Sequence, residues 1–324
     1  MRPSISEREK RPANDYGFSS QVGSRGSRLI LRDGSFNVVR TGLPFFRSFS
    51  IYHSLINMSW TGFYSLILAA FILGNALFSG IYLAVGISHL EGAAAANAWE
   101  RFSNAFFFSA QTITTVGYGH IHPSGFLTST LAALESMLGL LAFAIATGLL
   151  FARFARPQAK ILFSGEALVA PYHDHSGFMF RIANARNHTL IEAEVQVGLS
   201  LVTGQGASAR RHFHELGLER SRINFFAMSW TVVHPIDERS PLRNLTPEDL
   251  RAGDAEFFVL VKAYDDSFNQ TVHARFSYKP EEIVWGAKFS PIFGRNEAGA
   301  AVVDLGRLGE YEKAALPAPA SLKD

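Results

Sequence analysis

Two long runs without ionised side chains dominate this sequence. No Asp, Glu, Lys or Arg occurs between positions 54 and 88, and Glu135 is the only one between positions 121 and 152. A helix needs about 20 apolar residues to cross the roughly 30 Å of hydrocarbon in a bilayer. Both runs exceed this length. The sequence therefore predicts two membrane-spanning helices, over residues 60–87 and 126–154.

The flanks of these runs carry a charge asymmetry that predicts orientation. Basic residues precede the first span at Arg25, Arg28, Arg32, Arg40 and Arg47 and follow the second at Arg153, Arg156 and Lys160, while the connection between the spans offers only Arg101. Because basic flanks stay in the cytoplasm, we expect a multi-pass protein of the cell inner (plasma) membrane with both termini cytoplasmic. The first run lacks the short apolar core and cleavage site of a removed signal peptide.

The region before the first span divides into two predicted parts. Residues 1–43 are polar and contain a Gly/Ser/Arg stretch, so we expect a flexible cytoplasmic tail. Over residues 44–59 apolar side chains such as Phe45, Phe49 and Tyr52 recur every three or four positions, as in an amphipathic helix. We expect this helix to lie in the membrane interface. The alternative is that it only extends the first span.

The chain after residue 160 is typical of a β structure. Six segments rich in β-branched and aromatic residues occur at 166–171, 178–183, 190–202, 229–234, 256–264 and 270–278. Their spacing predicts an all-β sandwich over residues 158–310, followed by a C-terminal tail over residues 311–324. The expected fold is thus multi-domain, with an α-helical membrane part and a soluble β-sandwich.

Composition and motifs exclude several function classes. The chain has no cysteine and a formal net charge of +2, so we expect neither disulfides, nor thiolate metal sites, nor a nucleic-acid partner. It contains no phosphate-binding Gly-rich loop after a strand and no nucleophile elbow. An enzyme is therefore not indicated, and no cofactor is expected.

The segment between the spans carries the strongest functional signal. An apolar stretch at residues 101–113 is too short to span and predicts a re-entrant helix. It is followed by Thr114, Thr115, Val116, Gly117, Tyr118 and Gly119. Non-helical backbone at membrane depth must be buried in protein or line a water-filled path. Since glycine accepts positive φ, alternating residues here can turn their carbonyls toward one axis and replace the water around a cation.

This segment resembles the signature of potassium channels. The resemblance implies a selectivity filter at residues 114–119, with K⁺ as the permeant ion bound at Thr115, Val116, Gly117 and Tyr118. One chain supplies only one such loop, and four are needed to surround an ion. We therefore expect a homotetramer.

Motifs in the soluble half resemble those of inward-rectifier (Kir) channels, and the overall layout resembles their bacterial subgroup. They lie at residues 181–186, 229–242 and 271–278, and residues 151–157 are similar to the end of the family's second span. The resemblance implies a tetrameric pore above an immunoglobulin-like cytoplasmic β-sandwich, gated by anionic lipids including phosphoinositides.

The same resemblance suggests roles for residues of the second span. Phe143, Thr147 and Phe151, with Gly139, would form a pore-lining stripe, and Phe151 would be the gate at the bundle crossing. Phe143 stands where strongly rectifying members carry an acidic residue, so weak rectification is expected. Ba²⁺, Mg²⁺ and polyamines are the candidate blockers. Ordinary helix packing is the alternative explanation of the stripe.

Basic and acidic residues near the span ends complete the predicted sites. Arg47, Arg153, Arg156 and Lys160 would bind anionic lipid headgroups, with the sign of the effect left open. The alternative is that these charges serve topology alone.

Glu135 is an intramembrane carboxylate and so a functional-site candidate. We expect it to brace the filter from behind rather than to contact ions. A Glu/Arg pair that braces the filter in vertebrate members is missing, because the aligned residues are Gln111 and Ile121. His120 and His122 follow the filter as ordinary mouth residues or as sensors of external pH.

Two other functions compete with a lipid-regulated channel. The β-sandwich could belong to a membrane-anchored sensor with a vestigial pore. A ligand-gated two-span channel would need a nucleotide-binding regulatory domain, and the β pattern after residue 161 argues against one.

Overall fold

The computed structural model describes residues 26–39, 50–155, 160–186, 188–204, 208–297, 299 and 301–317. They form two compact units. We call residues 41–156 the membrane unit, and residues 157–324 together with residues 1–40 the β domain.

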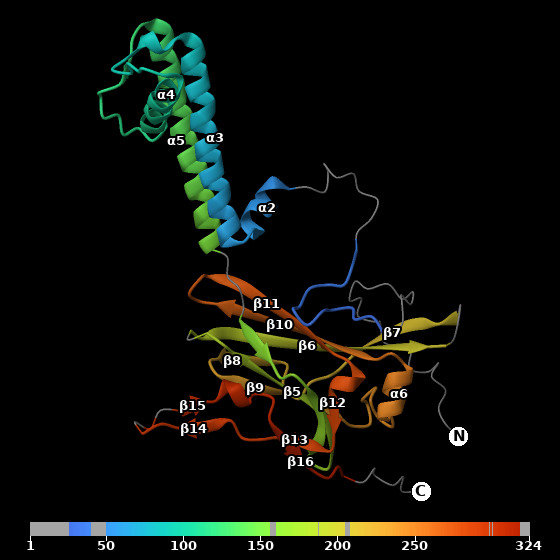
Figure 1. Cartoon of the computed structure of the whole chain (residues 1–324). Helices are drawn as coiled ribbons and strands as arrows, with labels where there is room; N and C mark the ends of the chain where they lie inside the picture. Colours follow the sequence, from blue (N-terminus) through green and yellow to red (C-terminus); the bar gives the residue numbers. More distant parts are fainter. Residues whose placement is uncertain are drawn as a thin grey trace, which may run out of the picture. The chain divides into compact units, whose positions relative to one another are not determined.

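Four α-helices lie in the described part of the membrane unit. They are α2 (Ile51–Asn57), α3 (Trp60–Val85), α4 (Ala98–Ile113) and α5 (Phe126–Phe154). Of the described helices, α3 and α5 are long and apolar enough to span a membrane, which confirms the two predicted spans. Within this unit α3 and α5 run side by side, and α4 packs against both at the end away from α2 (Figure 1).

Short polar residues set the ends of these helices. Ser50, Ser59 and Asn97 cap α2, α3 and α4, each accepting a hydrogen bond from a backbone N–H of the first turn. A short 3₁₀ turn (Ile87–His89) follows α3, and β1 (Leu90–Glu91) pairs with β2 (His122–Pro123). The helix before the filter starts at Ala98, three residues earlier than the predicted 101–113, because Asn97 supplies the cap.

The β domain contains two five-stranded sheets. In the first, β11 (Gln270–Tyr278), β10 (Glu256–Asp265), β6 (Leu190–Thr203) and β7 (Arg210–Glu215) lie in this order, and β8 (Arg222–Phe226) also pairs with β6. In the second, β12 (Ile283–Trp285), β4 (Ala167–Tyr172), β5 (His175–Asn184) and β3 (Ile161–Phe163) lie in order, and β9 (Ser229–Ile236) also pairs with β5. Only the β12–β4 pair of these sheets is parallel among the described strands.

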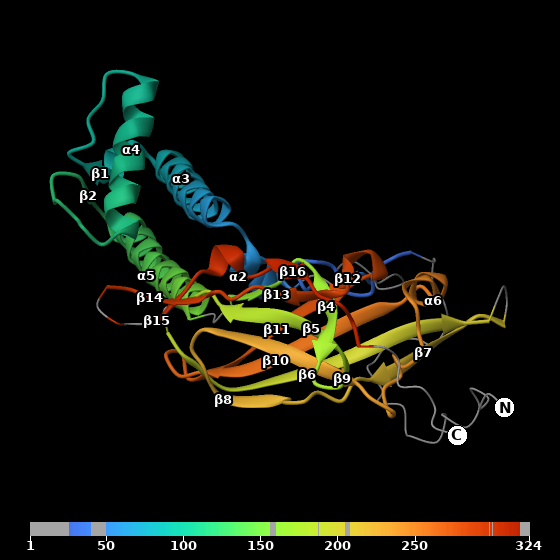
Figure 2. The same cartoon turned by 90° about the horizontal axis from the view of Figure 1, so that it is seen from below.

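The two sheets share one apolar core, as a β-sandwich requires. Phe178 of β5 stacks on Phe257 of β10 with ring centroids 4.4 Å apart, and both rings are buried. Figure 1 shows the sheet of β6, β10 and β11 above the sheet of β5 and β9, and Figure 2 shows the same strands from below. Helix α6 (Pro247–Ala252), which Thr246 caps, precedes β10. The expected β-rich domain is therefore confirmed.

Two predicted boundaries of this domain are wrong. The tail expected over residues 311–324 begins with a strand, β16 (Tyr311–Lys313), which pairs with β13 (Ala287–Phe289). A further hairpin joins β14 (Phe293–Arg295) and β15 (Ala301–Val303). The tail expected over residues 1–43 is also not flexible throughout, because residues 26–39 lie against the β domain with Ile30 buried. Residues 1–25 and 40–49, which include the first part of the predicted interfacial helix, lie outside the described residues.

Candidate functional site

The predicted filter begins by folding back onto the end of α4. The backbone N–H of Val116 donates to the carbonyl of Gln111 at 2.9 Å, and that of Thr115 donates to Thr112 at 3.0 Å. These bonds use carbonyls that a helix end leaves unpaired. The loop is therefore fixed to the C-terminus of α4, the end that carries partial negative charge.

Backbone conformation alternates along this loop. Thr115, Gly117 and Gly119 have φ of 59°, 51° and 85°, while Val116 and Tyr118 between them do not have positive φ. Alternation of left- and right-handed residues brings successive carbonyls to the same side of the chain. A left-handed β-branched residue such as Thr115 is a genuine outlier, and strain of this kind costs about 1–3 kcal/mol and concentrates at functional sites.

The loop lies on the surface of a single chain. All six residues are exposed, and the Tyr118 side chain is 76% exposed. A coordination shell needs oxygens on every side of the ion, so one chain can provide only a part of it.

A buried polar cluster lies where α3, α4 and α5 meet. The Glu135 carboxylate accepts hydrogen bonds from Tyr82 at 2.7 Å and contacts the Ser109 hydroxyl at 2.5 Å. The Ser109 hydroxyl also donates to the side-chain oxygen of Asn75, Oδ1, at 2.9 Å. All four side chains are fully buried. The cluster links one residue of α5, one of α4 and two of α3.

Sequence reasoning found Glu135 but missed its three partners. Asn75, Ser109 and Tyr82 are single polar or hydroxyl-bearing residues within apolar stretches, where a polar group must find a partner. That signal was available. Which of them face one another could not be read from a single helix.

A second contact behind the filter depends on a glycine. A Cβ at Gly139 of α5 would lie 2.1 Å from the carbonyl oxygen of Ile113, the last residue of α4. Gly139 thus packs against α4 rather than standing on an open pore-facing surface. The four residues of the predicted stripe do not share one face of α5, because positions four apart differ by about 40° around a helix of 3.6 residues per turn.

The rest of the stripe lies open on α5. Phe143 and Phe151 are each 73% exposed, and Thr147 is exposed as well. These three side chains have no covering partner within the described part of the chain. Their surface is free to face a pore, a neighbouring copy or lipid.

Arg153 is placed against the protein rather than on a free surface. Its guanidinium donates to the carbonyls of Leu55, Ile56 and Met58 at the end of α2 at 2.5–3.1 Å. It also lies 4.6 Å from the ring centres of Trp60 and Phe63. A cation here satisfies orphan carbonyls at a helix C-terminus. Arg153 therefore ties the end of α5 to α2.

The other predicted lipid-binding residues are less constrained. Lys160 is exposed at the start of the β domain. Arg47 and Arg156 lie outside the described residues.

Beyond the filter, the connection to α5 is held to the loop after α3. His122 Nε2 lies 3.1 Å from Glu91 Oε2 across the β1–β2 pair. A Cβ at Gly92 would lie 1.9 Å from the carbonyl oxygen of His120, so Gly92 permits a close backbone approach. His122 thus has a carboxylate partner, which the sequence did not reveal.

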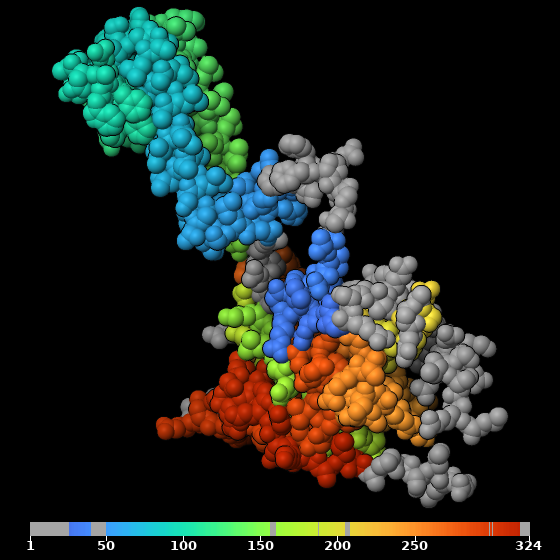
Figure 3. All heavy atoms as spheres, turned by 45° about the vertical axis from the view of Figure 1, so that its right-hand side comes forward, coloured from blue at the N-terminus to red at the C-terminus, as the bar shows by residue number. Residues whose placement is uncertain are grey.

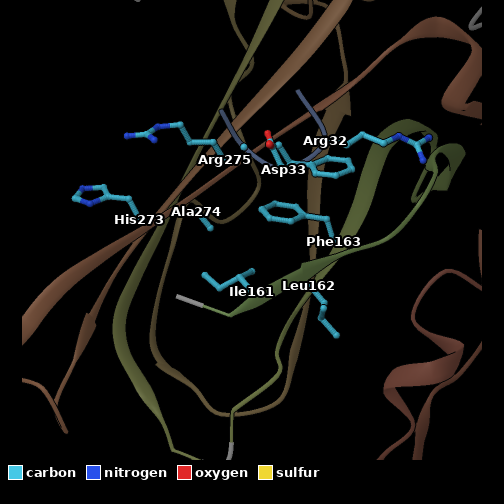
Figure 4. A pocket seen from close by; sticks show the side chains of 10 residues that line it. Arg32, Asp33, Ile161, Leu162, Phe163, His273, Ala274 and Arg275 are labelled. Atoms are coloured by element: carbon cyan, nitrogen blue, oxygen red, sulfur yellow. The ribbon is translucent and has the colours of Figure 1, made fainter. Parts of the chain in front are cut away.

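A cavity of about 370 Å³ lies in the β domain beside residues 26–39. It is lined by Arg32, Asp33 and Gly34, by β3, and by residues 273–276 of β11. Figure 4 shows the Phe163 ring in the middle of this cavity, facing the turn that carries Asp33. Phe163 stacks on Phe276 at 4.8 Å.

Two spans that enclose a short helix and a strained loop define a pore-loop ion channel. In agreement, residues 71–156 match a family model described as "Ion channel", and residues 161–323 match the inward rectifier potassium channel C-terminal domain. The chain belongs to the inward rectifier potassium channel family.

Three relatives illustrate the range of this similarity. The chain is 41% identical over 291 residues to the inward rectifier potassium channel Kirbac3.1 of Paramagnetospirillum magnetotacticum, covering 89% of this chain and 96% of the relative. It is 28% identical to inward rectifier potassium channel irk-1 of Caenorhabditis elegans, over 81% of this chain and 52% of that protein. It is 29% identical to mouse ATP-sensitive inward rectifier potassium channel 10, over 93% of this chain and 85% of that protein.

Proposed function

We propose that four copies of this chain form a K⁺-selective pore whose filter is residues 114–119. The observation that carries this proposal is the alternation of positive φ at Thr115, Gly117 and Gly119 directly after α4. Four such loops around one axis would present stacked rings of carbonyl oxygens to a dehydrated ion. K⁺ would bind at Thr115 through Tyr118.

The filter is proposed to be braced by the cluster around Glu135. Its carboxylate joins α3, α4 and α5 through Tyr82 and Ser109, which would hold α4 at a fixed distance from the ion path. Buried polar networks of this kind are rigid when every member has a partner.

The gate is proposed at Phe151. Four phenyl rings at one level would close the pore by excluding water. Phe151→Ala should raise closed-state Rb⁺ flux several-fold, while Phe126→Ala, an exposed phenyl at the other end of α5, should not. Equal leak from both variants would remove the gate from Phe151.

Weak rectification is proposed because Phe143 offers no negative charge to a pore blocker. Mg²⁺ and polyamines should therefore block weakly and with shallow voltage dependence. Steep spermine block that disappears only on changing Phe143 would contradict this.

A lipid site is proposed at the cytoplasmic membrane face, with both termini cytoplasmic. Lys160, together with Arg47 and Arg156, would attract anionic headgroups by about 1 kcal/mol each. Arg153 was predicted as a fourth member, and its contacts with α2 give it a positioning role in this site. Lys160→Gln should weaken the response of flux to phosphoinositide, whereas Lys262→Gln on β10 should leave it unchanged.

The decisive experiment is Rb⁺ uptake by purified protein in liposomes. We expect Rb⁺ uptake that Ba²⁺ blocks and that changes when phosphoinositide is added. We expect Na⁺ not to pass through the protein. Passage of Na⁺ as readily as K⁺ would overturn the proposal. Phosphoinositide binding without any flux would instead favour a membrane-anchored sensor.

A further inference from the structure

The short ladder of β1 and β2 has one buried side and one exposed side (Figure 2). Leu90 of β1 and Ile121, directly before β2, are buried in an apolar cluster with residues of α3 and α4. Glu91 and His122, the next residue along each segment, face each other across the ladder and are exposed. Successive side chains of an extended chain point to opposite sides. The buried pair therefore fixes the backbone, and the exposed pair is presented to the surroundings.

Backbone contacts on both sides hold this exposed pair in place. The N–H of Ser124 donates to the carbonyl of His89 at 2.8 Å. A Cβ at Gly92, where φ is 86°, would lie 1.9 Å from the carbonyl oxygen of His120, so the two loops also touch beyond the ladder. Figure 3 shows residues 90–125, coloured teal to green, gathered at the end of the membrane unit away from α2. The pair thus lies on a fixed backbone rather than on two independent loops.

The spacing of the two side chains is close to that of two ligands on one metal ion. His122 Nε2 lies 3.1 Å from Glu91 Oε2. Zinc binds histidine nitrogen and carboxylate oxygen at about 2.0–2.2 Å in tetrahedral geometry, which places two such ligands about 3.4 Å apart. Imidazole suits Zn²⁺, Cu²⁺ and Ni²⁺, whereas Mg²⁺ and Ca²⁺ prefer sites made of oxygen alone. The pair therefore has the chemistry of a transition-metal site.

The surroundings of the pair leave room for an ion. The His122 and Glu91 side chains are 54% and 58% exposed, and an exposed ion pair of this kind stabilises a protein little. A metal can therefore replace the direct contact at small cost. Within the described residues no group of three or more metal-ligating side chains occurs, so water would complete the shell. Arg101 is the only Lys or Arg between positions 48 and 152, so few fixed positive charges oppose a cation here.

We propose that Glu91 and His122 bind a divalent transition-metal ion such as Zn²⁺, and that the bound ion inhibits conduction. His122 follows Gly119 by three residues, which an extended chain spans in at most about 11 Å. Charges in physiological salt act over about 8 Å, so a divalent ion at the pair repels K⁺ near the end of the loop. Binding does not depend on the proposed function. Inhibition does.

Binding is tested by titrating Zn²⁺ into the purified full chain in a calorimeter. The double variant Glu91→Gln, His122→Gln removes both ligands. The control variant His173→Gln, Glu281→Gln changes the same residue types at exposed positions of the β domain. We expect the parent and the control to bind one Zn²⁺ per chain at a site that the first variant lacks. Equal binding of Zn²⁺ by the parent and by the variant without Glu91 and His122 would overturn the site.

A cysteine rescue separates a ligand from a residue that only holds the loop. The chain has no cysteine, and a thiolate is a good zinc ligand that cannot replace the imidazole in an ion pair with a carboxylate. His122→Gln should weaken Zn²⁺ binding by about tenfold or more, since even losing a residue that supports a ligand costs about 10- to 100-fold. His122→Cys, kept reduced, should restore binding. Equal weakening in both variants would overturn the role of His122 as a ligand.

Inhibition is tested by Rb⁺ uptake in liposomes with Zn²⁺ on both faces. The half-inhibitory Zn²⁺ concentration should rise by about tenfold or more in His122→Gln and in Glu91→Gln, and should stay unchanged in the β-domain control variant. Equal inhibition by Mg²⁺ would overturn the assignment to a transition metal. Zinc that binds at the pair without reducing uptake would overturn the inhibition and leave the site. A parent protein that binds Zn²⁺ at the pair yet carries no Rb⁺ would count against the proposed function instead.

Discussion

The two units of this chain differ in where their large apolar side chains lie. In the β domain the interior is apolar, with Phe178, Phe257 and their neighbours enclosed between the sheets. In the membrane unit large apolar residues such as Leu77 and Leu140 lie outside, and fully buried positions include Asn75 and Glu135. Lipid is as apolar as leucine, so helices in a membrane associate through packing of small residues and polar contacts. The β domain therefore completes its apolar core within one chain, whereas the membrane unit leaves large apolar side chains exposed on its surface.

The largest expected effect comes from the filter, where backbone conformation matters more than burial. A Cβ at Gly117 would meet nothing within 4 Å, yet its φ is 51°. Gly117→Ala therefore acts through conformation alone, at about 1–2 kcal/mol in each copy of the chain. We expect loss of Rb⁺ uptake in liposomes. Gly80→Ala, on α3 and equally open but with ordinary φ, should conduct normally. Normal uptake by both would break the assignment of the filter.

The next test truncates one large apolar side chain in each of the two units. Phe257→Ala should destabilise the β domain by about 3–5 kcal/mol, because it leaves a cavity between the sheets. Leu77→Ala removes a side chain that is 64% exposed in the membrane unit and should leave the β-domain transition unchanged. Differential scanning calorimetry of the purified protein measures both. Similar losses of β-domain stability in the two variants would refute the contrast in burial.

A third test changes a buried polar residue of the membrane unit, Glu135. Glu135→Ala would leave the Tyr82 hydroxyl buried without its partner, at about 1–3 kcal/mol for that unsatisfied group, while Ser109 would keep its hydrogen bond to Asn75. Glu135→Gln supplies one acceptor for Tyr82 and one donor for Ser109, so it can preserve the cluster. We expect reduced K⁺-over-Na⁺ selectivity and a lower melting temperature in the alanine variant only. Glutamine and alanine variants that behave alike would argue against the brace.

The smallest expected effect is on the pH dependence of the β domain. Burial lowers the pKa of His234, whose Nδ1 donates to Gly217 at 2.6 Å and whose Nε2 contacts Ser240 at 2.7 Å. The unfolded chain therefore takes up a proton below about pH 6.5 more readily than the folded one. Stability is full above that pH and declines as the pH falls below it.

Calorimetry between pH 7 and pH 5 measures this decline. His234→Gln should be less stable at pH 7 but flatter over this range, while His273→Gln, exposed on β11, should follow the parent. At lower pH we expect a steeper loss of folding stability, because carboxylates such as Asp254 then become protonated. Burial pushes the pKa of Asp254 upward, but Lys279 and Arg211 outweigh it and lower that pKa below its usual range. A parent curve without slope between pH 7 and pH 5 would contradict the role of His234.

Much of this architecture follows from local sequence patterns. The length of the runs without ionised side chains predicted α3 and α5. The segments rich in β-branched and aromatic residues predicted β5, β6, β10 and β11 close to their observed bounds. β7 was missed because its Arg-Arg-His-Phe-His-Glu sequence looks like a polar loop. The loop after α4 was predicted to be a filter because glycines at alternate positions are a local requirement, although the left-handed Thr115 was not expected.

The two spans, the glycine-containing loop after α4 and the β-rich domain could all be predicted from the sequence, because each depends on the spacing of neighbouring residues. Tertiary structure alone decided which distant residues meet. Glu256 binds Leu29 from 227 positions away, Ser109 and Glu135 join α4 to α5, and Arg153 turns to the end of α2. The physical reason is that a polar group's need for a partner is visible in the sequence, while the identity of that partner depends on how separate elements pack.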